Sequence, residues 1–431
     1  FKQEKTKEET MGKSFKNVGS RLILTLAAAL TLVLMTAFPT KAASKPSPIT
    51  ELKQIDDSST SVEVSWSCLG GSDTRYKVEV SEQPSTGYIV VEENAYSTSE
   101  YITGLSAGKT YYVRVTPFVE DDDTDQIIWG DTSAPVKVVT APDKAPATIT
   151  HTKSTTDSIT VNWSAVPGAD TYEVEYYIDS SKARKCVTTK TGVTLKKLAK
   201  NETYTIYVTA GRRYADGTTT AWSDNDLYKW GIPVKPSKVS GVDVTHYWQN
   251  LSEICVENSR IGCADGYQSQ LYTAYKDKDS KIKTVTTSSA YTYIKTSALK
   301  KHNFYKVKVR AYALNSKNEK MYGSWSSWKY VSPQPDVTSK KHTQKGIKIN
   351  WDKINGADRY VVYVSTKKDS GYKKFQTTTK TGTVIKKCGK NKLKSGKNYY
   401  FYVEPQKKVG NKYVSGLAGN ANYCWSLKYK K

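Results

Sequence analysis

The sequence is poor in the residues that most often build catalytic and metal-binding sites. Only four of its 431 residues are His, and they stand far apart at positions 151, 246, 302 and 342. The patterns GxSxG and HExxH and the P-loop are missing, as is GxGxxG in a strand–helix setting. We therefore expect a protein that is not an enzyme and that holds no cofactor and no metal.

Long apolar runs are absent except near the N-terminus. Met11 opens a positively charged segment, residues 22–38 are apolar, and small residues stand at 40 and 42. This is the pattern of a secretory signal peptide, here residues 11–42, with residues 1–10 as an upstream overhang. An apolar run of 17 residues is short for a membrane span. We therefore expect a secreted, extracellular mature chain without a transmembrane anchor. The missing LPxTG sorting motif favours non-covalent association with a cell wall.

The remainder of the chain repeats four times. Eight of the fourteen Pro form four pairs, whose first members lie 96, 91 and 100 residues apart. In each repeat, a Leu is followed six residues later by a Tyr that opens an alternating apolar run. Alternation with a period of two predicts a half-buried strand. The pairs are Leu105/Tyr111, Leu198/Tyr204, Leu299/Tyr305 and Leu393/Tyr399.

An earlier strand of each repeat also alternates, and in three copies it ends in Trp. These residues are Trp66, Trp163 and Trp351. The third repeat has Asn258 at this place, so its core must be filled in another way. Because each buried Trp or Tyr removes roughly 150–250 Å² from water, we expect these Trp and Leu–Tyr residues to form the structural core.

These motifs resemble the fibronectin type III domain, as found in secreted bacterial proteins with tandem repeats. The resemblance implies an all-β, immunoglobulin-like sandwich in each repeat. It also implies a Trp in the core on strand B, and a tyrosine corner in which the phenol bonds to backbone at the start of strand F. The predicted domains are domain one (46–140), domain two (143–235), domain three (236–335) and domain four (336–431).

Charge is unevenly distributed along these four domains. Residues 44–140 hold 7 basic and 16 acidic residues, a net charge of −9, whereas residues 336–431 hold 23 and 5, a net charge of +18. This asymmetry makes head-to-tail self-association between domains one and four an expectation to test. Otherwise, the basic domain is either an ordinary solvated surface or a surface for an anionic cell-wall polymer or glycan, or for another surface protein.

Lysine supplies nearly all of the positive charge in domain four. Lysine is a hydrated point charge suited to diffuse attraction, and the scarcity of Arg disfavours nucleic acid as a partner. The candidate surface for an anionic polymer consists of Lys367, Lys368, Lys373, Lys374, Lys386, Lys387, Lys407 and Lys408.

An acidic segment, residues 120–125, follows a predicted strand of domain one. Its Asp121, Asp123 and Asp125 have the spacing of the first three ligands of a calcium loop, but Gln126 and Thr132 stand where Gly and Glu are required. We expect a solvated hairpin tip, and the sequence leaves calcium binding open.

Six Cys in an exported chain can pair. Cys255 with Cys263 and Cys388 with Cys424 are the candidate disulfides within domains, and inert free thiols are the alternative. No CxxC spacing occurs, which disfavours metal knuckles.

Aromatic residues suggest a second class of function. Trp325-Ser-Ser-Trp328 resembles the Trp–Ser box of cytokine-receptor domains, in which Trp stacks on basic side chains, and Lys308 and Arg310 are the candidate cations. We expect this motif to serve packing. The leading expectation for the whole chain is a non-catalytic surface, adhesion or spacer protein. The alternative is a carbohydrate-binding protein that uses exposed Trp and Tyr.

Overall fold

The computed structural model describes residues 44–431 apart from 123, 180, 247–251, 277 and 418–422. The predicted overhang 1–10 and signal peptide 11–42 lie outside this part. Within it, every regular element is a β-strand. It contains no helix that is long and apolar enough to cross a membrane.

The strands form four successive groups, to which we apply the names domain one to domain four. Each group has a three-stranded sheet and a second sheet of four or five strands, and all pairings within these sheets are antiparallel. In domain one, the first sheet consists of β1 (Thr50–Asp57), β2 (Val62–Ser67) and β5 (Ser99–Ile102). The second consists of β4 (Ile89–Ala95), β3 (Arg75–Ser81), β6 (Thr110–Asp121), β7 (Gln126–Trp129) and β8 (Val136–Val139).

Domains two and three repeat this arrangement. In domain two the sheets are β13 (Gly192–Leu195), β10 (Ile159–Trp163) and β9 (Ile149–Ser154), then β12 (Arg184–Thr188), β11 (Thr171–Tyr177), β14 (Thr203–Arg213) and β15 (Thr220–Pro233). In domain three they are β16 (Asp243–His246), β17 (Glu253–Glu257) and β20 (Tyr291–Lys295), then β19 (Lys281–Thr287), β18 (Gly266–Thr273), β21 (Tyr305–Leu314), β22 (Lys320–Tyr322) and β23 (Lys329–Val331).

Domain four adds a short hairpin to the two sheets. The sheets are β24 (Val337–Thr343), β25 (Gly346–Trp351) and β28 (Gly382–Ile385), then β27 (Lys373–Thr378), β26 (Arg359–Ser365), β31 (Asn398–Val409), β32 (Lys412–Ser415) and β33 (Trp425–Lys428). The hairpin consists of β29 (Lys387–Cys388) and β30 (Asn391–Lys392).

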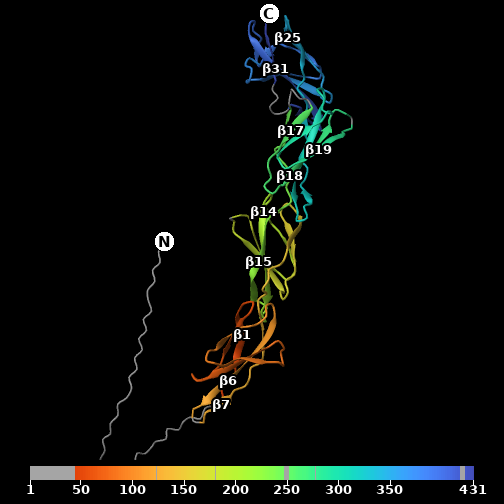
Figure 1. The fold of residues 1–431 in the computed structure, drawn as a ribbon. Helices are drawn as coiled ribbons and strands as arrows, with labels where there is room; N and C mark the ends of the chain where they lie inside the picture. The colour runs from red at the N-terminus through yellow and green to blue at the C-terminus, as the bar shows by residue number, and fades with distance from the viewer. Residues whose placement is uncertain (1–43, 123, 180, 247–251, 277, 418–422) are drawn as a thin grey trace, which may run out of the picture.

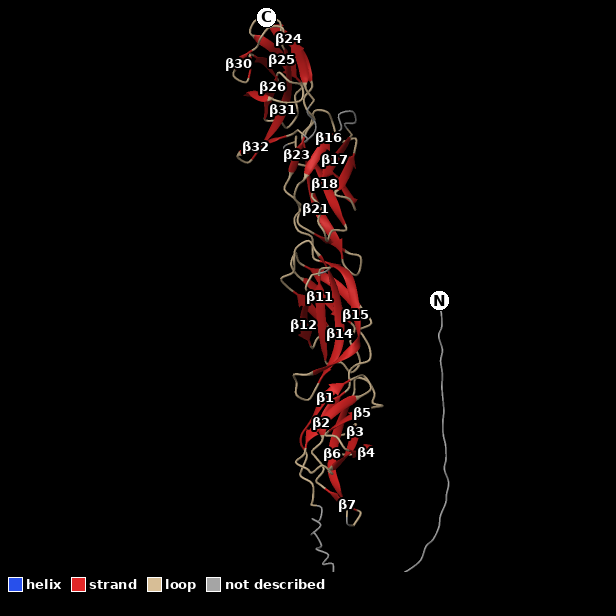
Figure 2. Ribbon diagram, turned by 90° about the vertical axis from the view of Figure 1, so that its left-hand side faces the viewer, coloured by secondary structure: helices blue, strands red, loops and turns tan. Residues whose placement is uncertain are grey.

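Alternating side chains explain why these strands face one another as a sandwich. In β2, Val62, Val64 and Trp66 are buried while the residues between them are half-buried. This is the period-two pattern of a strand with one face on a core. The predicted all-β sandwich fold is confirmed. The four domains follow one another end to end along an extended molecule (Figures 1 and 2), so residues at the junctions decide its shape.

Candidate functional site

The predicted core residues lie inside the sandwiches and hold the fold. Trp66, Trp163 and Trp351 are buried, and each meets a Tyr ring edge-on with centroids 5.2, 5.5 and 5.6 Å apart. Asn258, which replaces the Trp in domain three, is also buried, and its Nδ2 donates to the Ser259 carbonyl at 3.0 Å.

Each of the four corner tyrosines makes an equivalent hydrogen bond. Each phenol oxygen accepts a backbone N–H from the residue five positions earlier, at 2.7–2.8 Å. The tyrosines are Tyr111, Tyr204, Tyr305 and Tyr399, and all four are buried. Their partner leucines pack at the core, with Leu198 and Leu299 buried and Leu105 and Leu393 partly buried. The corners therefore fix the loop before strand F, which we call the corner loop: residues 103–109, 196–202, 296–304 and 386–397 in domains one to four.

Corner loops are also where successive domains meet. The segment between the second strand of each domain, which ends at or just before the Trp or Asn258 position, and the next strand is called the docking turn: 164–170 in domain two, 258–265 in domain three and 352–358 in domain four. In the first junction, a Cβ at Gly168 of the docking turn would clash with the Gly108 carbonyl of the corner loop. In the second, a Cβ at Gly262 would lie 2.7 Å from the Asn201 carbonyl oxygen. The same two segments therefore meet at successive junctions, with backbone against backbone.

Arg212 fastens the first junction. From β14 of domain two, its Nη1 donates to the carbonyls of Gly108 (2.9 Å) and Gly168 (2.7 Å), and its Nη2 donates to Thr110 Oγ1 (2.7 Å). One guanidinium thus bonds to both domains, a use that its planar fork of donors suits better than an ammonium does.

The tip of the last hairpin of domain two adds a second contact to this junction. The Tyr214 phenol donates to the Asp57 carboxylate of β1. Burial is the main cause that raises the pKa of both groups above their ordinary values. The bond therefore joins a neutral phenol to a partly desolvated carboxyl group.

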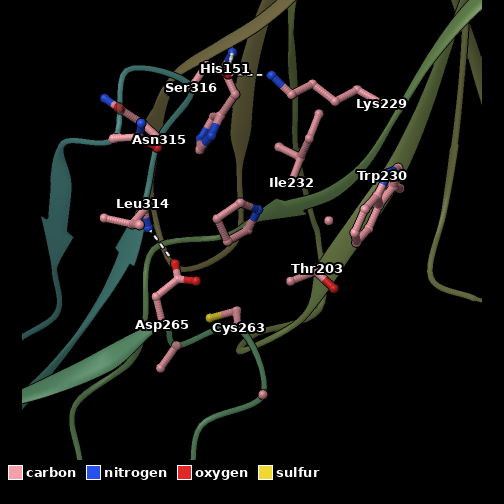
Figure 3. Close-up of a pocket in the computed structure, with 15 residues that line it drawn as sticks. His151, Thr203, Lys229, Trp230, Ile232, Cys263, Asp265, Leu314, Asn315 and Ser316 are labelled. Atoms are coloured by element: carbon pink, nitrogen blue, oxygen red, sulfur yellow. Dashed lines mark hydrogen bonds between the residues drawn. The ribbon is translucent and has the colours of Figure 1, made fainter. Parts of the chain in front are cut away.

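The second junction contains a cavity of about 370 Å³ between domains two and three (Figure 3). The His151 N–H donates to Ser316 Oγ at 2.7 Å, and Lys229 Nζ donates to the same oxygen at 3.0 Å. Across the cavity, Asp265 accepts the Leu314 N–H at 2.7 Å. His151 and Lys229 of domain two therefore hold Ser316 of domain three at this cavity.

The His151–Ser154 pair beside this cavity is not an activated nucleophile. His151 Nε2 lies 2.7 Å from Ser154 Oγ, but that hydroxyl donates its own proton to the Pro233 carbonyl at 3.0 Å. The imidazole is therefore the donor to the serine rather than its general base. Burial, and secondarily the positive charge of Lys229, lowers the pKa of His151 to about 4, so the ring is neutral near pH 7. No cluster of three or more His, Cys, Asp or Glu suited to a metal occurs in the part of the chain that the structure describes.

At the third junction, the corner loop of domain three again meets the docking turn of domain four. In addition, one apolar side chain, which we call the apolar plug, enters the core of the neighbouring domain. The Asn355 N–H donates to the His302 carbonyl at 2.7 Å, and the Phe304 N–H donates to the Asn355 carbonyl at 3.0 Å. The Phe304 ring is fully buried and belongs to the hydrophobic core of domain four, although its backbone belongs to domain three.

The predicted lysine surface divides into two groups. Six of its members are exposed, and no acidic side chain among the described residues forms an ion pair with them: Lys367, Lys368, Lys373, Lys374, Lys386 and Lys387. Lys407 is half-buried and its Nζ donates to the Gly356 carbonyl at 3.3 Å, which makes it a docking-turn contact like Arg212. Lys408 is exposed, and its backbone N–H donates to Asp358 at 2.6 Å.

The structure forms neither candidate disulfide, and all six Cys are free in it. Strand alternation explains the first pair. Ile254 and Val256 of β17 point into the core that includes Cys263, so Cys255 between them points away, beside Tyr293. In domain four, Cys388 contacts the Val364 carbonyl at 3.6 Å, whereas Cys424 contacts the Lys368 carbonyl at 3.7 Å.

The acidic segment of domain one begins at the end of β6, in Glu120 and Asp121, and precedes β7. Asp121 Oδ1 accepts the backbone N–H of Thr124 at 3.0 Å and its hydroxyl at 2.9 Å. Asp123 lies outside the described residues, so the predicted spacing of calcium ligands stays untested.

Trp325 and Trp328 form a ladder with the cations of β21. Lys308 Nζ lies 4.5 Å from the Trp325 centroid and 4.9 Å from that of Trp328, and Arg310 lies 4.4 Å from Trp325. Ser326 Oγ accepts the Val309 N–H at 3.0 Å, which secures the segment to the strand. Both predicted cations therefore take part in the packing role expected for this motif.

Comparison with known proteins agrees with this architecture. The model of the fibronectin type III domain matches residues 46–136 and 144–226. The chain is similar to the chicken CNTN1 FN1–FN3 domains at 16% identity, over 67% of this chain and 99% of that one, with a TM-score of 0.25. It is also similar to a two-domain fibronectin type III segment of chicken tenascin at 20% identity, over 43% of this chain and 98% of that one, with a TM-score of 0.23. The fibronectin type III family model thus matches domains one and two, and domains three and four repeat their pattern of two antiparallel sheets.

Proposed function

We propose that this protein is a secreted, non-catalytic spacer or adhesion protein that is retained at an anionic cell envelope through domain four. The observation that carries the proposal is the repeated docking of corner loop against docking turn. This docking favours a fixed relation between successive domains, in contrast to the mobility expected when domains share only a linker. A stiff array with its positive charge at one end can bind at that end and present the other.

Charge supports the direction of this proposal. The net charge runs from −9 in residues 44–140 to +18 in residues 336–431. Exposed Lys without acidic partners attracts a polyanion over about a Debye length, roughly 8–10 Å at physiological salt. Domain four is therefore the end that we assign to the envelope.

Binding of the full chain to immobilised polyphosphate, with uncharged dextran as control, tests this assignment. We expect retention on polyphosphate that weakens about tenfold or more between 50 and 200 mM salt, since exposed charges are screened. A variant with Lys367, Lys368 and Lys374 changed to Gln should elute at lower salt. Retention that ignores salt, or that equals retention on dextran, would contradict the proposal.

A second candidate function is carbohydrate binding, and the aromatic side chains of β15 favour it. Trp230 is 77% exposed and Tyr228 is 57% exposed. Tyr228 also stacks on Tyr207 with ring centroids 5.3 Å apart, which fixes the orientation of its ring. Flat exposed aromatic faces suit the apolar faces of sugar rings. A glycan array should then give signals that Trp230→Ala removes and that high salt leaves unchanged.

A further inference from the structure

The corner loop of domain four differs from its three counterparts. It runs for 12 residues (386–397), whereas the others have 7 (103–109), 7 (196–202) and 9 (296–304). The additional residues form the β29–β30 hairpin, which Figure 2 places at the edge of the domain. Six of the 12 residues are Lys. The segment that docks another domain in the first three repeats is therefore longer and strongly basic in the fourth.

This docking face is also uncovered. The Gly396 N–H donates to the Tyr429 carbonyl, as the Gly108 N–H does to Ala141 in domain one, so these two glycines hold the same place. A Cβ at Gly108 would lie 3.0 Å from the Gly168 Cα of the next domain, whereas one at Gly396 would have no atom within 4 Å.

Beside this face, the hairpin and β27 enclose a cavity of about 220 Å³. Four Lys line it, together with Asn391 and Cys388, and no lining residue is acidic. The four are Lys373, Lys392, Lys394 and Lys397.

Local structure holds two parts of this cavity in place. The Lys394 N–H donates to the corner phenol of Tyr399 at 2.8 Å, which ties the loop to the core. Gly389 has a φ of 61°, and a Cβ there would lie 2.9 Å from Lys373 Cδ, so the Lys373 stem lies across the hairpin turn. The cavity is therefore built on a fixed loop rather than on a mobile tail.

Three of the five acidic residues of domain four have partners outside the cavity. Asp336 pairs with Lys301 and Asp352 with His302, both across the third junction, and Asp358 accepts the Lys408 N–H in the docking turn. Four ammonium groups that share one cavity without an acidic partner repel one another. A bound anion would relieve this repulsion.

Resting on the proposed function, we propose that this cavity is a subsite for one phosphate or sulfate group of a polyanion. Such a group carries several acceptor oxygens, and ammonium donors bind it as point charges. Asn391 offers an additional amide donor. The subsite would thus provide a discrete position of recognition within a surface that otherwise attracts polyanions diffusely.

Titration of the full chain with inorganic phosphate, sulfate and acetate at constant ionic strength tests the subsite. The readout is the alkylation rate of Cys388, which is one of the residues that line the cavity, with the other five Cys as internal references. Lys373 and Lys397 lower the pKa of this thiol against the larger, opposite effect of burial. An anion that neutralises them should slow alkylation severalfold and saturably. Phosphate and sulfate should act at lower concentrations than acetate.

Matched variants decide whether the cavity or the total charge is responsible. Lys373→Gln/Lys397→Gln should weaken phosphate binding about five- to tenfold, whereas Lys345→Gln/Lys380→Gln, which removes two exposed Lys outside the cavity, should change it less than about twofold. Equal effects of the two variants, or no saturable response of Cys388, would overturn the subsite.

Two further results separate this inference from the proposed function. Saturable phosphate binding without retention on polyphosphate would support the subsite and contradict envelope retention. Conversely, Lys373→Gln/Lys397→Gln could abolish self-association of the chain and leave phosphate binding intact. These Lys would then bind the acidic domain one of a second copy, which would overturn the inference.

Discussion

The first and third junctions use the same backbone segments but different side chains to hold them. At the first, Arg212 of domain two donates three hydrogen bonds, two of them to domain one and one to Gly168 of its own domain. At the third, Lys407 stands in the matching place with one bond of 3.3 Å, and the buried ring of Phe304 supplies the contact instead. The comparison indicates that docking of corner loop against docking turn is the constant element. The additional side-chain contact differs between the junctions: hydrogen bonds of Arg212 at the first, and the buried ring of Phe304 at the third.

The largest effect is expected at the apolar plug. Phe304→Ala should destabilise domain four by about 3–5 kcal/mol, because it leaves a cavity in that domain's core. Since Phe304 belongs to the backbone of domain three, this would couple the two domains. Differential scanning calorimetry of the full chain should register a lower transition for domain four. An unchanged transition would show that the plug contributes nothing.

Glycine substitution tests the shared docking itself. Gly168 has a φ of 81° and meets Gly108, whereas Gly217 of the same domain has a φ of 71° and open space around its Cβ position. Gly217→Ala should cost about 1 kcal/mol through backbone strain alone, and Gly168→Ala about 3 kcal/mol because a clash is added. Equal losses in urea unfolding would mean that the close approach at the first junction is not maintained in solution.

The middle junction should respond to acid. The pKa of His151 is about 4 in the folded chain against 6.5 as its ordinary value, so the unfolded chain binds the additional proton first. Stability is therefore complete above pH 6.5 and falls by about 1.4 kcal/mol per pH unit between 6.5 and 4. Unfolding free energies at pH 7 and 5 measure this loss, about 2 kcal/mol. His151→Gln should flatten the slope in this window, and a slope that persists would assign it to other groups.

The smallest effects are expected for alanine substitution of Arg212 and of Lys407, the matching cations of the first and third junctions. Arg212→Ala should weaken the first junction by about 2 kcal/mol, because three charge-assisted bonds are lost. Lys407→Ala should cost less than about 1 kcal/mol at the third. Arg212→Lys serves as the control that keeps charge and loses the fork. Amide hydrogen exchange of the corner loops reports each junction separately, and similar protection losses for both alanine variants would remove the distinction.

Much of the fold could be predicted from the sequence because its signals are local and recur in phase. Trp66, Tyr111 and their counterparts mark the two strands with the strongest alternation, so spacing predicts these strands, and the resemblance to the fibronectin type III domain implies the sandwich and its corner. Cys255 is a different case. The separation along the chain suggests a bridge to Cys263, but strand alternation turns Cys255 away from the core into which Cys263 packs.

The junctions could not be predicted in the same way. Arg212 is an ordinary strand residue in the sequence, and its partners Gly108 and Gly168 lie 104 and 44 residues away. Lys407 is indistinguishable in the sequence from its neighbours in a basic strand, so the sequence alone places it on the predicted polymer surface. Comparison of matched positions in all four repeats would have aligned Arg212 with Lys407. These groups come into contact only through the way in which successive domains are arranged, and a local sequence pattern does not predict that arrangement.

Small-angle X-ray scattering of the full chain at low and high salt is the most direct test of fixed junctions. We expect the scattering of one extended particle, with the same maximum dimension at both salt concentrations, and a shorter, broader distance distribution for the Arg212→Ala/Phe304→Ala variant. A wild-type curve that already fits freely jointed domains, and that the variant leaves unchanged, would contradict the account.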